Sequence, residues 1–204
     1  MSHFQVITPA ANGSILSLEE LREAAGVTGS GSDDYLGRLG ISASTALARR
    51  CCIITDGATP PSLLSEDCRE TLRWTECGPI RLSRKPVTSI ISVTVAGVLV
   101  AGASYELSGG YALHYLSDGD LASWPAGRIV VDYQAGFTTP PGDLKLAATK
   151  LVTALNAEKT RDPNLKREDI VGVMEREYWV SPSDDPLLSR EIADLLSPYV
   201  ERWI

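Results

Sequence analysis

Apolar residues occupy every second position in several short runs through the middle of the chain, which is the period of a β-strand with one buried face. Tight-turn sequences such as Ala96-Gly97 separate the runs. A parallel crossover needs about a dozen residues or more, so these short connections predict antiparallel neighbours. The pattern therefore predicts an antiparallel β meander at about residues 67–137. The apolar sides of its clearest runs are Ile91, Val93 and Val95; Tyr111, Leu113 and Tyr115; and Ile129, Val131 and Tyr133.

Two helices are predicted before this β block. Ser17 and Glu20 have the spacing of a capping box, and Gly26 follows as a stop signal after about Ala25. Ser32 marks a second helix start, with acidic residues beside the positive end of the helix dipole. One face of this second helix is expected to carry Leu36, Leu39, Ala43, Ala46, Leu47 and Arg50.

The second helix depends on packing for its stability. Gly37 and Gly40 each cost about 1 kcal/mol relative to alanine in a helix interior. The run SASTALA at 42–48 is rich in small residues, which suits close approach to another helix.

Helical periodicity returns after the Pro140-Pro141 pair. A helix is predicted over about 143–159, followed by a proline-punctuated segment and a last short helix. Residues 160–204 are therefore interpreted as an extended arm and C-terminal tail, and residues 1–159 as a helical core that carries the β insertion. The fold class is α+β. The apolar positions are Leu144, Ala148, Leu151 and Leu155 in the long helix, and Leu188, Ile192, Leu195 and Leu196 in the last one.

Charge and composition narrow the possible functions. The 204-residue chain carries a formal net charge of −7, from 19 basic and 26 acidic residues. This balance argues against a protein that holds nucleic acid by neutralising phosphates. No segment approaches the roughly 20 apolar residues that span a bilayer, and the N-terminus does not read as a secretory signal.

The cysteines and histidines do not form a metal-binding pattern. Cys51 and Cys52 are adjacent, and neither Cys68 nor Cys77 has a zinc-type partner spacing. We expect reduced, mostly buried thiols, with a Cys68–Cys77 bridge across a hairpin as the alternative.

Signatures of catalysis are missing from the sequence. It contains no phosphate-binding loop, dinucleotide fingerprint, nucleophile elbow or metalloprotease motif. His114 lies in the middle of a predicted strand, where a packed sheet histidine explains it. We expect no enzyme, no cofactor and no metal. Two alternatives stay open: a metal-dependent α+β hydrolase that uses Asp118 or Asp120, and a cytoplasmic module whose β meander binds a small ligand or peptide.

Aromatic residues gather near the C-terminus, in segments poorly placed to form a core of their own. Such residues are favoured as anchors at interfaces. The candidate partner interface, with another subunit, consists of Tyr178, Trp179, Tyr199, Trp203 and Ile204. The alternative is that this segment folds back onto its own domain.

The order of several short motifs resembles a known family, the head–tail connector (adaptor) proteins of long-tailed double-stranded DNA phages and of gene transfer agents. Each motif is weak alone, but their order and spacing over about residues 18–199 are fairly specific. The motifs are LEEL at 18–21, DDYL at 33–36, RKPV at 84–87, SIISV at 89–93, PAGRIVVDY at 125–133, AGF at 135–137, PGDL at 141–144 and LLSPY at 195–199.

The resemblance implies a helical bundle with a β insertion that assembles, usually as a twelve-fold ring, beneath a portal protein. Such a ring joins the portal to the next neck or tail protein and leaves a channel through which DNA passes without specific binding. The expected location is the virion neck, with the host cytoplasm during assembly, and no membrane is involved.

Overall fold

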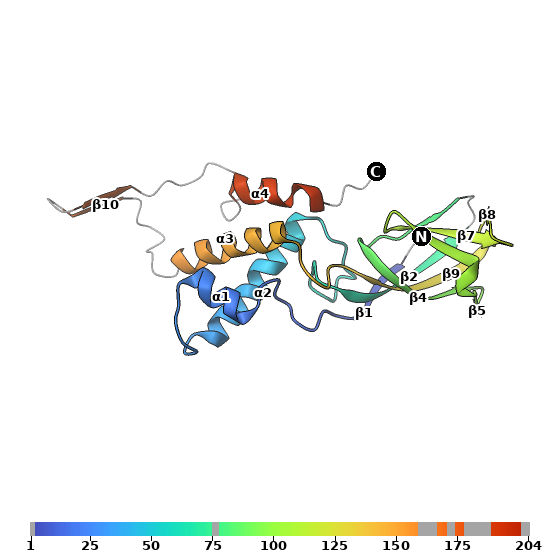
Figure 1. Ribbon diagram of the computed structural model, residues 1–204, viewed down its shortest axis with the longest axis horizontal. Coiled ribbons are helices and arrows are strands. Elements are labelled where there is room, and N and C mark those ends of the chain that lie inside the picture. The colour runs from blue at the N-terminus through green and yellow to red at the C-terminus, as the bar shows by residue number, and fades with distance from the viewer. Residues whose placement is uncertain (1–2, 75–77, 159–166, 171–173, 178–188, 201–204) are drawn as a thin grey trace. The chain divides into compact units, whose positions relative to one another are not determined.

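The computed structural model describes residues 3–74, 78–158, 167–170, 174–177 and 189–200. The chain forms two compact units. The β unit consists of Met1–Gly13 and Cys52–Pro140, and the helical unit consists of Ser14–Cys51 and Pro141–Ile204. Figure 1 shows strands β1 to β9 gathered in the β unit, while helices α1 to α4 and the short strands β10 and β11 belong to the helical unit, which confirms the predicted α+β fold class. The expected boundary between core and arm at residues 159–160 lies outside the described residues and stays a prediction.

The larger sheet of the β unit has five antiparallel strands in the order β1-β2-β9-β4-β5. Their bounds are His3–Thr8 for β1, Glu66–Trp74 for β2, Gly127–Ala135 for β9, Val87–Val95 for β4 and Val98–Leu99 for β5. Strand β1 was not predicted. Strand β9 lies between β2 and β4, so this sheet does not follow the chain order of a meander.

The smaller sheet has the order β3-β7-β6, and β8 also pairs with β7. Its strands are Ile80–Arg81 (β3), Tyr105–Ser108 (β6), Ala112–Ser117 (β7) and Asp120–Ala122 (β8), with a 3₁₀ turn η1 at Gly102–Ser104 before β6. Strands β6, β7 and β8 are joined in chain order and antiparallel, so this part of the block is the predicted meander.

The two sheets share one hydrophobic core. Strand β9 supplies its centre because its apolar residues alternate as predicted, with Ile129, Val131 and Tyr133 buried. From the smaller sheet, Leu113 of β7 is buried in the same cluster, and Trp124 donates its indole N–H to the carbonyl oxygen of Leu113 at 3.1 Å. The buried members of the cluster are Cys68, Ile80, Leu82, Val87, Val93, Leu113, Trp124, Ile129, Val131, Tyr133 and Ala135.

The prediction that Ile91 shares the inner face of its strand is wrong. The register of β4 against β9 shifts between Ile90 and Ser92, which is the mark of a β-bulge. Ile90 packs against the core, whereas Ile91 is 57% exposed. The extra residue of the bulge breaks the period of two, which is why alternation alone put Ile91 on the wrong side.

The helical unit begins with α1 (Leu18–Ala25) and α2 (Asp33–Arg50). The capping box is confirmed: the backbone N–H of Ser17 donates to Glu20 Oε2 at 2.8 Å, and the backbone N–H of Glu20 donates to Ser17 Oγ at 3.2 Å. At α2 the Ser32 side chain makes no capping hydrogen bond. Asp33 instead forms a bidentate pair with Arg22 of α1, with contacts of 2.8 and 2.6 Å.

The buried face of α2 is rotated from the predicted one. Leu36, Ala43 and Leu47 are buried as expected, but Arg50 is exposed. The small residues Gly40, Ser44 and Ala48 take its place in the buried stripe. A Cβ at Gly40 would lie 2.8 Å from Leu21 Cδ1, so the glycine is what lets α1 approach α2.

Helix α3 (Gly142–Glu158) is the long helix predicted after the proline pair. Leu144, Ala148 and Leu151 are buried and Leu155 is half-buried, which confirms the predicted face. Helix α4 (Arg190–Leu196) buries Ile192 and Leu196 and continues into the 3₁₀ turn η2 at Ser197–Tyr199. Leu188 lies outside the described residues.

Two short antiparallel strands lie within the segment interpreted as an arm. They are β10 (Arg167–Ile170) and β11 (Met174–Glu177). Glu168 is directly opposite Arg176, while Asp169 is opposite Glu175. The hairpin was not predicted from the sequence.

Candidate interaction surfaces

The predicted aromatic interface is only partly within the described structure. Of its five members, Tyr199 is described, while Tyr178, Trp179, Trp203 and Ile204 lie outside the described residues. Their role at an interface therefore stays a prediction.

Tyr199 lies at the base of the C-terminal tail and contacts its own helical unit. It ends the 3₁₀ turn after α4, is half-buried, and its hydroxyl is 3.4 Å from Asp143 Oδ2 in the first turn of α3. Burial, and then the neighbouring Asp143 carboxylate, raise the pKa of Tyr199, so its hydroxyl stays protonated. Tyr199 therefore contacts its own helical unit, and its role at a partner interface stays a prediction.

Helix α4 positions that turn. The Ser189 hydroxyl accepts a hydrogen bond from the backbone N–H of Ile192 at 3.4 Å, so the helix starts with a capping residue. Its apolar residues Ile192 and Leu196 are buried, and Glu191 pairs with Lys150 of α3 at 3.0 Å. The 3₁₀ turn that ends at Tyr199 therefore follows a packed and capped helix.

A buried ionic network lies inside the β unit, and sequence reasoning missed it. The side chains of Arg84 and Glu66 are 1% and 2% exposed, and Arg84 Nη2 lies 2.9 Å from Glu66 Oε2. Arg84 also donates to the carbonyl oxygens of Ile54 (3.0 Å) and Ser62. It thereby ties the loop before β2 to the sheet. Burial raises the pKa of Glu66, and the Arg84 charge opposes that rise.

Glu70 extends this network on the inner side of β2. Its carboxylate accepts hydrogen bonds from the backbone N–H of Ser83 (2.9 Å), the Ser83 hydroxyl (2.6 Å) and the Tyr133 hydroxyl (3.2 Å). Glu66, Cys68 and Glu70 occupy alternate positions of β2, so their side chains lie on the same side of the strand. Because Cys68 is buried, this alternation was the signal in the sequence that both glutamates are buried. The network joins elements within one unit and presents no open face, so we interpret it as structural.

The structure decides between the two predictions for Cys68, a reduced buried thiol or a disulfide bridge. Cys68 is a free thiol with no exposed surface, which contradicts the alternative of a Cys68–Cys77 bridge. Burial raises the pKa of the Cys68 thiol to about 12. Cys51 is also buried, whereas Cys52 is exposed.

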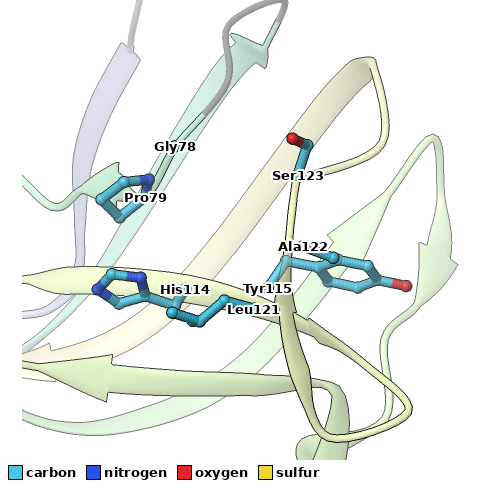
Figure 2. Close-up of a pocket in the computed structure, with 7 residues that line it drawn as sticks. All are labelled: Gly78, Pro79, His114, Tyr115, Leu121, Ala122 and Ser123. Carbon is cyan, nitrogen blue, oxygen red and sulfur yellow. The ribbon is translucent and has the colours of Figure 1, made fainter.

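A pocket of about 360 Å³ lies on the smaller sheet, where β3 and β8 meet β7. In Figure 2 the rings of His114 and Tyr115 project in opposite directions from β7, as adjacent strand positions must. The pocket is open, since Leu121 is 72% exposed. Figure 2 shows that its polar side chains, His114, Tyr115 and Ser123, do not point toward one another, so the site does not favour the ligand-binding alternative. Its lining is Gly78, Pro79, His114, Tyr115, Leu121, Ala122 and Ser123.

Asp118 lies in the exposed turn between β7 and β8, and Asp120, also exposed, begins β8. Asp118 adopts a left-handed conformation with φ 54°, which aspartate tolerates in turns. Across the part of the chain that the structure describes, no group of three or more His, Cys, Asp or Glu side chains is placed to hold a metal ion. Within the same residues, no helix is long and apolar enough to cross a membrane.

Comparisons with known proteins bear on the fold. No family model matches the sequence, and no curated protein matches it. Among solved structures, chains in the neck of an empty gene transfer agent particle with C6 symmetry and in a native gene transfer agent virion match with TM-scores of 0.60. Both are 19% identical and cover 98% of this chain and 96% of the other.

A third match, from the neck of a native gene transfer agent particle with C12 symmetry, has a TM-score of 0.57 and 19% identity and covers 98% of this chain and 97% of the other. At this level of identity the likeness establishes a shared fold. For the fold, it agrees with the ordered motifs, which indicated a family that includes proteins of gene transfer agents.

Proposed function

We propose that this chain is a structural protein of a virion neck, a head–tail connector (adaptor), and not an enzyme. The observation that carries the proposal is the fold similarity to chains of gene transfer agent necks and virions, which spans 98% of the chain and nearly the whole length of the matched chains. The ordered motifs over 18–199 indicate the same family independently of the coordinates.

In this proposal, copies of the chain form a ring beneath the portal, with twelve copies as the expected number. One matched neck was determined with C12 symmetry, which is compatible with that number. The ring joins the portal to the next neck or tail protein and leaves a central channel for DNA. A net charge of −7 suits a conduit that DNA traverses without being held.

The C-terminal tail is the proposed portal contact. Because Tyr199 is bound to Asp143 in the helical unit, we place the docking segment after the 3₁₀ turn, at residues 201–204. These residues include Trp203 and Ile204, an aromatic and an aliphatic anchor of the kind that dominates interface energies.

The test is to mix the purified chain with an isolated portal ring and to examine the mixture by size-exclusion chromatography and negative-stain imaging. We expect a second ring of density on the portal. Deletion of residues 201–204 should abolish co-elution with the portal while leaving the circular dichroism spectrum unchanged. Tyr199→Phe, which removes only the hydroxyl contact to Asp143, is the matched control and should bind normally.

The possible results distinguish the tail contact, the neck function and the two alternative functions from one another. Full binding by the truncated chain would overturn the tail contact alone, whereas no association of the intact chain with the portal would overturn the neck function. Stoichiometric metal that is lost in Asp120→Asn would support the hydrolase alternative. A ligand-dependent rise in melting temperature together with a strictly monomeric state would support the binding-module alternative.

A further inference from the structure

Two arginines lie side by side on the outer face of the larger sheet. Arg73 of β2 and Arg128 of β9 are directly opposite each other, and both are exposed. Within the residues that the structure describes, neither guanidinium group has a hydrogen bond or an ion pair. Like charges directly opposite each other destabilise an antiparallel pair, so this arrangement costs free energy in the isolated chain.

Arg69, the neighbouring arginine of β2 on the same face, has a carboxylate partner. Arg69 lies opposite Asp132 and binds it in a bidentate pair, with contacts of 2.6 and 2.9 Å. Arg69 is thus neutralised within the sheet, whereas no carboxylate among the described residues pairs with Arg73 or Arg128. A guanidinium pair of this kind is suited to an incoming carboxylate, because each can bind it in fork geometry.

Apolar residues adjoin the two arginines on the outer face. The register places Val130 beside Thr94 of β4, and Thr94 beside Leu99 of the edge strand β5. Leu99 is 68% exposed. We call Arg73, Arg128, Val130 and Leu99 the arginine face.

The smaller sheet carries the complementary features. Asp118 in the turn between β7 and β8 and Asp120 at the start of β8 are both exposed, and neither forms an ion pair in the described part of the chain. Leu121 follows, is 72% exposed, and lies opposite Leu116 on the side of β7 that faces away from the core. We call Asp118, Asp120 and Leu121 the acidic tip.

The two features cannot satisfy each other within one copy. The sheets pack on each other through a shared core that contains Val131 of β9 and Leu113 of β7. Arg128 of β9 and Leu121 of β8 occupy strand positions whose side chains point away from the shared core. Because the core lies between the two sheets, the two side chains are on opposite outer faces. Figure 1 shows β5 and β8 at the same end of the β unit. Two β units placed side by side could therefore bring one arginine face against one acidic tip.

We propose that the arginine face of one copy binds the acidic tip of a second copy. Two carboxylates match two guanidinium groups, and Leu121 meets the apolar part formed by Val130 and Leu99. The contact joins different surfaces on the two copies, so it is heterologous. Repetition of such a contact produces a closed ring when the rotation from one copy to the next is a whole fraction of a full turn. The proposal specifies a contact between neighbouring copies of the proposed ring and so rests on the proposed function. Its test measures self-association, separately from portal binding.

The test measures self-association of the full chain by sedimentation velocity over a series of protein concentrations, at low and at high salt. We expect a reversible association that weakens with added salt, because exposed charge pairs are screened. Arg73→Glu with Arg128→Glu should raise the dissociation constant by about tenfold or more, since the facing charges then repel. This double variant keeps a like-charge pair across β2 and β9, so it does not alter the repulsion within the sheet.

The reciprocal variant is Asp118→Asn with Asp120→Arg, in which asparagine preserves tolerance for the left-handed φ at position 118. It should also raise the dissociation constant by about tenfold or more. An equimolar mixture of the two charge-reversed proteins should recover association, because each then offers one complementary surface. The control is Arg38→Glu with Arg81→Glu, which changes the net charge equally at two exposed arginines outside the arginine face and should associate like the unmodified chain.

Three results would overturn the proposal. They are an unmodified chain that stays monomeric at every concentration, an arginine variant that associates normally, or a mixture that stays dissociated although both variants show native melting curves. Binding of a short DNA duplex by the unmodified chain, lost in the arginine variant while self-association is kept, would assign the arginine face to phosphates instead.

Discussion

At the scale of single residues, the least expected feature is a full charge in the core of the β unit. Arg84 belongs to the RKPV motif, which in the sequence gave only a family resemblance. In the structure its guanidinium group forms an ion pair with Glu66 and donates hydrogen bonds to two loop carbonyl groups. A buried pair of this kind contributes little net stability relative to apolar residues, but loss of one partner leaves the other charge buried and unpaired.

We predict that Arg84→Ala lowers the free energy of unfolding by about 3–5 kcal/mol, because Glu66 loses its counter-charge while buried. Urea denaturation followed by tryptophan fluorescence measures the loss. The control is Arg69→Ala, which breaks an ion pair whose arginine side chain is 46% exposed and should cost less than about 1 kcal/mol. Equal losses in the two variants would contradict the structural role of Arg84.

Cys68 gives a second prediction at this scale. Its burial raises the pKa of the thiol to about 12, so near neutral pH almost none of it is the reactive thiolate. We expect Cys68 to resist iodoacetamide at pH 8 in the folded protein and to react readily in urea. Peptide mass spectrometry reads the modification at each cysteine. Labelling of Cys68 at the same rate in both conditions would show that the thiol is accessible in the native state.

At the scale of elements, packing changed the faces that periodicity predicted. The buried face of α2 includes more small residues than predicted, because Gly40 permits Leu21 of α1 to approach closely. The β-bulge in β4 turned Ile91 outward for a comparable reason: register is set by the pairing partners as well as by the local pattern.

The two glycines of α2 provide a matched test. Alanine at Gly37 meets no atom within 4 Å and should stabilise the protein by about 0.5–1 kcal/mol through helix propensity. Alanine at Gly40 would place its Cβ 2.7 Å from Ser14 Oγ and 2.8 Å from Leu21 Cδ1. Overpacking of this kind costs about 1–3 kcal/mol, which exceeds the gain in helix propensity.

We therefore expect thermal unfolding to show a higher melting temperature for Gly37→Ala and a lower one for Gly40→Ala. Similar shifts in the same direction for both variants would mean that the contact between α1 and α2 is loose enough to relax.

At the scale of the whole molecule, the chain combines two compact units with terminal segments that we assign to partners. The segment interpreted as an arm contains the β10–β11 hairpin, and we propose that it reaches a neighbouring subunit or the next ring. A photo-reactive amino acid in place of Met174 should form cross-links between copies once the ring is assembled on a portal. The same protein at low concentration without portal is the control and should give cross-links within one chain only. Exclusively intrachain products in the assembled ring would contradict the proposed reach of the arm.

The sequence by itself determined the local elements and the family resemblance. Helix caps, proline breaks and alternation act over a few residues, so the capping box at Ser17, the helix after Pro141 and the inner face of β9 were all predictable. Only the tertiary structure decided which strands are neighbours, where the bulge falls and which charges meet. The pairing of Arg84 with Glu66 and the juxtaposition of Arg73 with Arg128 join residues far apart in the chain. Such contacts depend on strand order and register, which no local pattern encodes.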